Sequence, residues 1–260
     1  MTAGTLAGPR ILTPGPILES ARYLQGVRQR SERDPRLATR ILPYRIGVGD
    51  SIDARKAIDS LVKLHVDFVK IRTTESPAAY FAILREARRA GLVVAGHQPS
   101  VASVVTAVDS GQRDIEHAIG PPLSRLSAEA RDSIYLEFAK RGTWYTPTLV
   151  VANAVTLTPD SAMRAIFSDE AARTDERRGY AAPWLLEWWR MQVEEALRDT
   201  SNARVLGARE MYASNLGDVR RMHELGVLVL AGTDAGSVLV YPDSRGELDA
   251  MLAGVRRDVR

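Results

Sequence analysis

The sequence of 260 residues contains no cysteine. This absence excludes disulfide bonds, iron–sulfur clusters, thiolate zinc sites and a cysteine nucleophile. Histidine is scarce as well, because only His65, His97, His117 and His223 are present. Any metal site in this chain must therefore be built from these histidines, from carboxylates or from a less usual ligand.

Long apolar runs and concentrated charge are also missing. No run of about 18 apolar residues exists, so we predict no transmembrane helix and no membrane partner. The first eight residues lack the basic and apolar regions of a signal peptide, which predicts a cytoplasmic protein. Although the pI is near 9.3, Lys and Arg exceed Asp and Glu by only 35 to 32 and lie scattered. A nucleic-acid-binding module would need a basic stripe or a known motif, so we expect no nucleic-acid partner.

What the sequence does contain is a repeated order of short apolar segments and amphipathic segments. Hydrophobic residues make up 45% and charged residues 26%, which is ordinary for a globular protein. Helix starts are marked by Asp50, Ser76 and Ser127, and helix ends by Gly91 and Gly142. We expect strands at 10–13, 66–71, 92–97, 114–117, 143–150 and 227–234, an extended segment at 42–48, and helices at 50–62, 76–89, 101–109, 127–140, 183–198 and 201–225.

Strands that alternate with helices predict parallel βα units and an α/β fold. The spacing of the units and the chain length suit a (β/α)8 or TIM barrel of about 250 residues. A doubly wound open sheet is the alternative, although its G-x-G-x-x-G fingerprint is absent. The alternation of strands and helices stops after Val150, and we expect a helical insertion over 150–225. We expect the whole chain, 1–260, to form a single domain.

Four of the expected strands carry a polar residue at or next to their carboxyl end: Lys70, His97, His117 and Asp234. Each belongs to the strand face that carries the preceding apolar side chains, because strand residues alternate faces. The carboxyl ends of the strands of a parallel barrel meet at one mouth, where catalytic residues lie. Imidazole and carboxylate ligands suit zinc, manganese or iron. The pattern therefore predicts a metal site at this mouth.

The segments Phe68–Ile71, Ala95–His97, Ile115–Ala118, Thr146–Leu149 and Ala231–Gly236 resemble the amidohydrolase superfamily. The similarity is to its imidazolonepropionase-like and Xaa-Pro dipeptidase-like metal-dependent hydrolases. This resemblance implies a partial TIM barrel that corresponds to strands three to eight of the family's barrel.

The resemblance also implies roles for the four strand-end residues. Lys70 would be carboxylated and bridge two metals, and His97 and His117 would be metal ligands. Asp234 would bind metal and move a proton. The implied cofactor is a divalent metal, zinc above all, as one or two ions. The implied reaction is hydrolysis of a C–N bond in a small amide, cyclic amide or dipeptide by metal-activated water.

One family feature is missing, because no two histidines stand in an H-x-H pair. We expect His65 and His223 to be structural. The family's N-terminal β-sandwich, its first two strands and most of its C-terminal return have no counterpart here, so the metal site is incomplete. The alternative is therefore an inactive fragment or a degenerate amidohydrolase. Two open edges of a partial barrel would favour aggregation or pairing into a homo-oligomer.

Overall fold

The computed structural model describes residues 10–33, 35–117, 125–151, 179, 181–198 and 202–234. The chain divides into two compact units. Unit 1 comprises Met1–Leu123 and Ser127–Trp144, and unit 2 comprises Ser124–Leu126 and Tyr145–Arg260. The expectation of one domain over 1–260 stays a prediction. None of the described helices is both long and apolar enough to cross a membrane.

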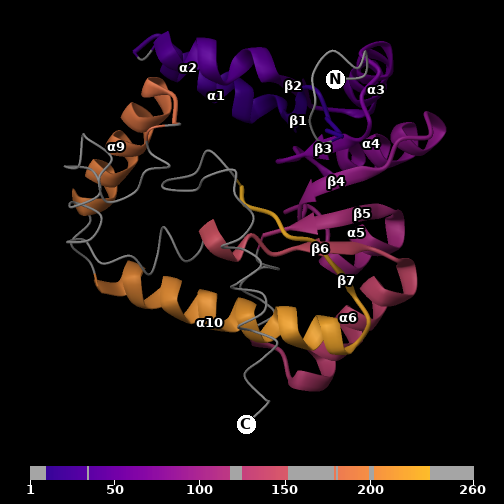
Figure 1. Ribbon diagram of the computed structural model, residues 1–260. Coiled ribbons are helices and arrows are strands. Elements are labelled where there is room, and N and C mark those ends of the chain that lie inside the picture. The colour runs from indigo at the N-terminus through magenta and orange to yellow at the C-terminus, as the bar shows by residue number, and fades with distance from the viewer. Residues whose placement is uncertain are drawn as a thin grey trace. The chain divides into compact units, whose positions relative to one another are not determined.

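Unit 1 contains a parallel sheet of five strands in the order β2-β1-β3-β4-β5 (Figure 1). The strands are β1 (Ile17–Ser20), β2 (Arg45–Val48), β3 (Val69–Ile71), β4 (Val94–His97) and β5 (Gln112–Glu116). The helical elements are α1 (Ala21–Ser31), α2 (Pro35–Arg40), η1 (Leu42–Tyr44), α3 (Ser51–Lys63), α4 (Pro77–Arg89), α5 (Val104–Ser110) and α6 (Ala128–Arg141). β3, β4 and β5 therefore end side by side at one edge of the sheet.

The helices begin and end where the sequence marks them. Asp50 accepts hydrogen bonds from the backbone at the start of α3, and Ser76 and Ser127 do the same for α4 and α6. Gly142 follows α6 in the left-handed conformation that a residue with a Cβ rarely adopts. The expected helix at 101–109 starts later, because Ser103 caps α5.

The first expected strand, at 10–13, is wrong. Thr13 lies in a loop, where its backbone N–H donates to Asp67 Oδ2 at 2.8 Å and its carbonyl accepts from the Asp67 N–H at 2.9 Å. Gly15 then turns the chain with φ +61°, and β1 starts at Ile17. The extended segment at 42–48 becomes η1 followed by β2, which pairs with the outer side of β1.

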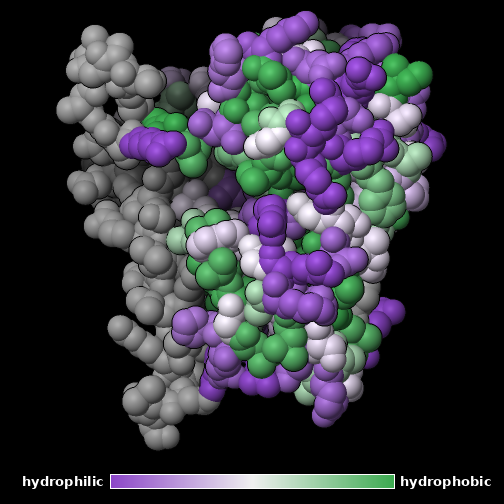
Figure 2. Space-filling model, turned by 90° about the vertical axis from the view of Figure 1, so that its right-hand side faces the viewer, coloured by the Kyte–Doolittle hydropathy of each residue, from purple (hydrophilic) through white to green (hydrophobic). Residues whose placement is uncertain are grey.

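The core of unit 1 lies between these strands and the helices that follow them. Leu18, Val69 and Ile115 on the strands are at most 1% exposed, as are Ile58 on α3 and Tyr80 on α4. The outer face, on which α3 and α4 lie, mixes hydrophilic and hydrophobic residues, as Figure 2 shows. Burial of each large apolar side chain contributes about 1.5–3 kcal/mol, so packing of the helices onto the sheet holds the strand ends in place.

Unit 2 contains most of β6 (Trp144–Thr146), α9 (Pro183–Arg198), α10 (Asn202–Glu224) and β7 (Leu228–Val229). The N–H of Leu230 donates to the carbonyl of Tyr145 at 2.9 Å, which places β7 beside β6. The two helices agree with those expected at 183–198 and 201–225, whereas β7 is much shorter than the strand expected at 227–234. Residues 152–178 of the expected insertion lie outside the described residues.

Candidate metal centre

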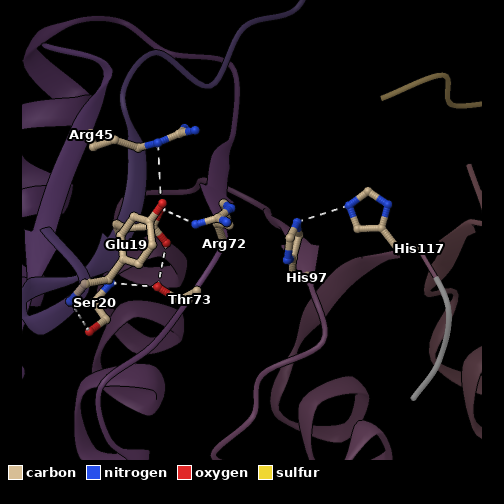
Figure 3. Close-up of polar contacts among 8 residues, drawn as sticks. Glu19, Ser20, Arg45, Arg72, Thr73, His97 and His117 are labelled. Carbon is tan, nitrogen blue, oxygen red and sulfur yellow. Dashed lines mark hydrogen bonds and ion pairs between the residues drawn. The ribbon is translucent and has the colours of Figure 1, made fainter. Parts of the chain in front are cut away.

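Three of the four predicted site residues come together in unit 1. Lys70 is the middle residue of β3, His97 ends β4, and His117 follows the last residue of β5. The imidazole Nε2 atoms of His97 and His117 lie 3.1 Å apart, and the two rings meet edge to face with centroids 4.6 Å apart (Figure 3). The parallel strands thus bring together two histidines that are far apart in the sequence.

Glu116 completes a ligand set that the sequence did not predict. One ligand atom from each of His97, Glu116 and His117 lies within 4.8 Å of the other two. Two imidazole nitrogens and a carboxylate oxygen form the all-N/O set that zinc, manganese and iron accept. The residues present therefore fit a divalent metal.

Burial makes His97 suitable as a ligand. Burial, together with the smaller electrostatic effects of His117, Lys70, Arg72 and Arg45, lowers the pKa of His97 from 6.5 to about 3. The imidazole of His97 is consequently neutral at physiological pH. A metal ligand must be in this form, because a protonated ring has no free lone pair.

Simple strand alternation does not account for the position of Glu116. Adjacent strand residues point to opposite faces, and this pattern would separate the side chain of Glu116 from that of His117. His117 instead has φ +64°, and at this left-handed residue the pleat no longer sets the side-chain direction. The Glu116 carboxylate lies 3.8 Å from His117 Nε2. The adjacent Glu-His pair at the end of the strand was the available signal.

Lys70 forms an ion pair with Glu116 through its Nζ atom, and both side chains are 17% exposed. A lysine in this pair carries a positive charge, whereas a carboxylated lysine carries a negative one. Carboxylation of Lys70 stays a prediction.

A second polar cluster lies beside the histidines and surrounds the fully buried carboxylate of Glu19 on β1 (Figure 3). This carboxylate accepts hydrogen bonds from Arg72 Nη1 at 2.9 Å and Thr73 Oγ1 at 2.5 Å, and Arg45 Nε is 3.7 Å away. The Arg72 guanidinium also lies over the ring of Tyr23, 4.9 Å from its centroid. No local sequence pattern indicates this cluster, which joins β1, β2 and the segment after β3.

Asp234, the fourth predicted residue, belongs to unit 2. It lies beyond β7, is exposed and has φ +50°. Its role in metal binding and proton transfer stays a prediction. His65 is exposed in the turn after α3, and His223 is exposed on α10. Neither belongs to the described cluster of ligands, and the structural roles expected for them stay a prediction.

A pocket of about 520 Å³ lies at the opposite end of β4 and β5 from His97. Its basic residues bind the chain itself, since Arg88 Nη2 donates to the carbonyl of Ser110 at 2.9 Å and Arg113 donates to the carbonyl of Arg141. These carbonyls belong to the last residues of α5 and α6, where positive charge is favourable. These contacts explain why Arg88 and Arg113 lie at the pocket, and no bound ligand is needed to explain them.

Several solved structures are similar to this chain. A bottromycin amidohydrolase is 23% identical with a TM-score of 0.61, over 83% of this chain and 48% of that chain. A Xaa-Pro dipeptidase with bound methionine is 20% identical with a TM-score of 0.58, over 97% of this chain and 54% of that chain. The ochratoxinase of A. niger is 14% identical with a TM-score of 0.56, over 90% of this chain and 48% of that chain. This chain has the amidohydrolase fold.

The amidohydrolase fold confirms the expected α/β class and partial TIM barrel. The chain spans about half the length of these solved structures. No protein-family model and no curated protein matches it. Of the segments that carried the resemblance, Ala118, Ala235 and Gly236 lie outside the described residues.

Proposed function

We propose that this protein is a metal-dependent hydrolase that cleaves a C–N bond in a small amide, cyclic amide or dipeptide. The observation that carries the proposal is the cluster of His97, Glu116 and His117 at the carboxyl ends of β4 and β5. The amidohydrolase fold supports the reaction class, because the similar solved structures include an amidohydrolase and a dipeptidase. Zinc is the proposed metal, since imidazole and carboxylate suit it.

A bound divalent metal supplies a water of lowered pKa and polarises the carbonyl of the substrate. His97 and His117 offer neutral nitrogen ligands, and Glu116 offers negative charge. Asp234 accepts the proton of the attacking water and donates it to the leaving nitrogen, which is the work of a general base and then a general acid.

Lys70 has two roles in this proposal. Without metal its ammonium group balances the charge of Glu116. With metal and with bicarbonate, which is in equilibrium with dissolved CO₂, the ammonium would lose a proton, and its nitrogen would bond to CO₂ with release of a second proton. The resulting carbamate would be a second anionic ligand for the metal.

The decisive experiment measures bound zinc or manganese and hydrolysis of a panel of dipeptides and lactams. We expect the double variant His97→Ala, His117→Ala to lose metal and activity together. The double variant His65→Ala, His223→Ala is the matched control, because both residues are exposed, and it should keep both properties. Unchanged metal content in the first variant would refute the site.

Asp234→Asn separates the proposed proton carrier from the ligands. We expect this variant to keep the metal and to lose hydrolysis. Metal-bound wild-type protein that hydrolyses nothing in the panel would favour the alternative of an inactive amidohydrolase. That alternative also predicts zero or one metal per chain, because the H-x-H pair is missing. Two metals per chain would contradict it.

A further inference from the structure

The buried side-chain amide of Gln112 connects β5 to the strand end that carries His97. Gln112 is the first residue of β5 and is 0% exposed. Its Nε2 atom lies 3.2 Å from the carbonyl oxygen of Gly96, 3.0 Å from that of His97 and 3.1 Å from that of Asp114. An amide nitrogen has two hydrogens, so the three oxygens share them. The amide therefore binds two consecutive carbonyls of β4.

The backbone of β4 is unusual at these two carbonyls. Gly96 has φ +135°, and a Cβ at this position would lie 2.0 Å from the carbonyl oxygen of Ile71 on β3. The pairing of β4 with β5 also shifts register, because Val94 pairs with Gln112 while Ala95 pairs with Asp114. The Gln112 amide is therefore a side-chain donor to two carbonyls in an irregular part of β4.

We infer that Gln112 is a positioning residue for His97, and this inference rests on the proposed metal-dependent function. Its amide binds the carbonyl of His97 itself. It thereby fixes the backbone from which the imidazole extends to 3.1 Å from the ring of His117. Groups that orient a metal ligand from outside the ligand set raise metal affinity by about 10- to 100-fold.

Tyr80 provides a matched control at the other end of the same amide. Its hydroxyl donates to Gln112 Oε1 at 2.9 Å, and the ring is fully buried on α4. Tyr80→Phe removes a buried hydrogen bond of Gln112 and leaves both donor hydrogens on the carbonyls of β4. A purely structural role would make the two residues equivalent. A positioning role would make only Gln112 matter for the metal.

The experiment compares Gln112→Leu and Tyr80→Phe with the wild type in the full chain. Zinc affinity is measured by competition with a chromophoric chelator, the visible spectrum of the cobalt-loaded protein reports ligand geometry, and thermal unfolding reports stability. We expect both variants to unfold at lower temperature. Only Gln112→Leu should lose zinc affinity, by about 10- to 100-fold, and show an altered cobalt spectrum.

Two results would overturn the inference. One is an unchanged zinc affinity and cobalt spectrum in Gln112→Leu. The other is an equal loss of affinity in Tyr80→Phe, which would tie the loss to stability alone. If Gln112→Leu does not fold, Gln112→Glu decides, because it keeps the shape and the Tyr80 partner but has at most one donor hydrogen. Weakened zinc binding supports the inference, and unchanged binding refutes it.

A measurement without metal separates this inference from the proposed function. Ring ¹H–¹⁵N NMR correlations of His97 report its contact with His117 in the metal-free protein. We expect Gln112→Leu to move the His97 signals and to leave those of the distant His65 in place. Wild-type protein that binds no metal would refute the proposed function, and the NMR comparison would still test the positioning of His97. Unmoved His97 signals would refute the positioning.

Discussion

The ion pair between Lys70 and Glu116 crosses a strand. Lys70 belongs to β3 and Glu116 to β5, and β4 lies between these two strands. The pair therefore joins the two strands on either side of β4, the strand that ends at His97. In the proposed function each group would change its partner on metal binding, and this exchange can be measured.

We expect Lys70 to gain the mass of one CO₂ only when metal and bicarbonate are both supplied. Native mass spectrometry checks this, because carbamates are lost in acid. Lys70→Met should show no gain under any condition, and Lys140→Met, which alters an exposed lysine on α6, should behave as the wild type. A fully metal-loaded wild type without the gain would mean that Lys70 remains the counter-charge of Glu116.

Zinc should stabilise the folded protein through His97. At a free zinc concentration 100 times the dissociation constant, binding adds about 2.7 kcal/mol to the free energy of unfolding. Chemical denaturation with zinc and after removal of zinc by a chelator measures this difference. We expect it to vanish in His97→Gln and to persist in His223→Gln. An equal zinc effect in both variants would place the ion elsewhere.

Mild acid should destabilise the metal-free protein through the same residue. Burial and, to a smaller extent, neighbouring charges lower the pKa of His97 to about 3 in the folded state, against 6.5 as the ordinary value. Below pH 6.5 the unfolded chain takes up a proton at His97 that the folded chain does not. The free energy of unfolding therefore decreases as the pH is lowered. Backbone and hydroxyl hydrogen bonds hold the pKa of Glu75 below 4.5, so its contribution is lost at lower pH. Between pH 6.5 and 4.5, His97→Gln should show a smaller decline than the wild type.

Gly96→Ala should be strongly destabilising. The added Cβ meets the Ile71 carbonyl oxygen at 2.0 Å, and φ +135° is strained for any residue with a side chain. We expect a loss of at least about 3 kcal/mol in the free energy of unfolding, from overpacking and backbone strain together. Gly91→Ala is the control, since φ is +71° there but a Cβ meets nothing within 4 Å. It should cost only about 1 kcal/mol, and equal losses would contradict the close approach of β3 and β4.

Removing the partner of a buried charge should lower the free energy of unfolding more than removing the partner of an exposed charge. Arg72→Gln takes away a hydrogen bond to the fully buried carboxylate of Glu19. We expect a loss of about 2–3 kcal/mol in urea denaturation. Lys140→Gln breaks an ion pair with Glu137 on α6 in which the two side chains are 66% and 30% exposed, and it should barely change stability. A similar response of the two variants would contradict the burial of Glu19.

The sequence predicted the features that local chemistry encodes. Asp50, Ser76 and Ser127 are helix caps whose effect extends over a few residues, and the apolar segments before Lys70 and His97 identify parallel strands. The order of parallel strands was enough to bring Lys70, His97 and His117 to one edge of the sheet, although alternation does not set the direction of the His117 side chain.

The remaining features depend on contacts between distant segments. Thr13 lies in a loop because Asp67 binds it, which no local pattern reveals. Glu116 joins the ligands because φ at His117 is positive, and the bulged pairing that Gln112 stabilises depends on how β4 and β5 meet. Arg45 on β2 and Arg72 lie against the Glu19 carboxylate, and nothing in the sequence around Glu19 indicates these contacts.

The left-handed backbone at His117 puts the stability of the fold and the proposed metal binding in opposition. A residue with a Cβ loses about 1–2 kcal/mol in this conformation, and glycine or asparagine tolerates it better. Selection for thermostability alone would therefore replace His117, whereas selection for metal binding would retain it. A library screened separately for heat resistance and for zinc retention should diverge at this position.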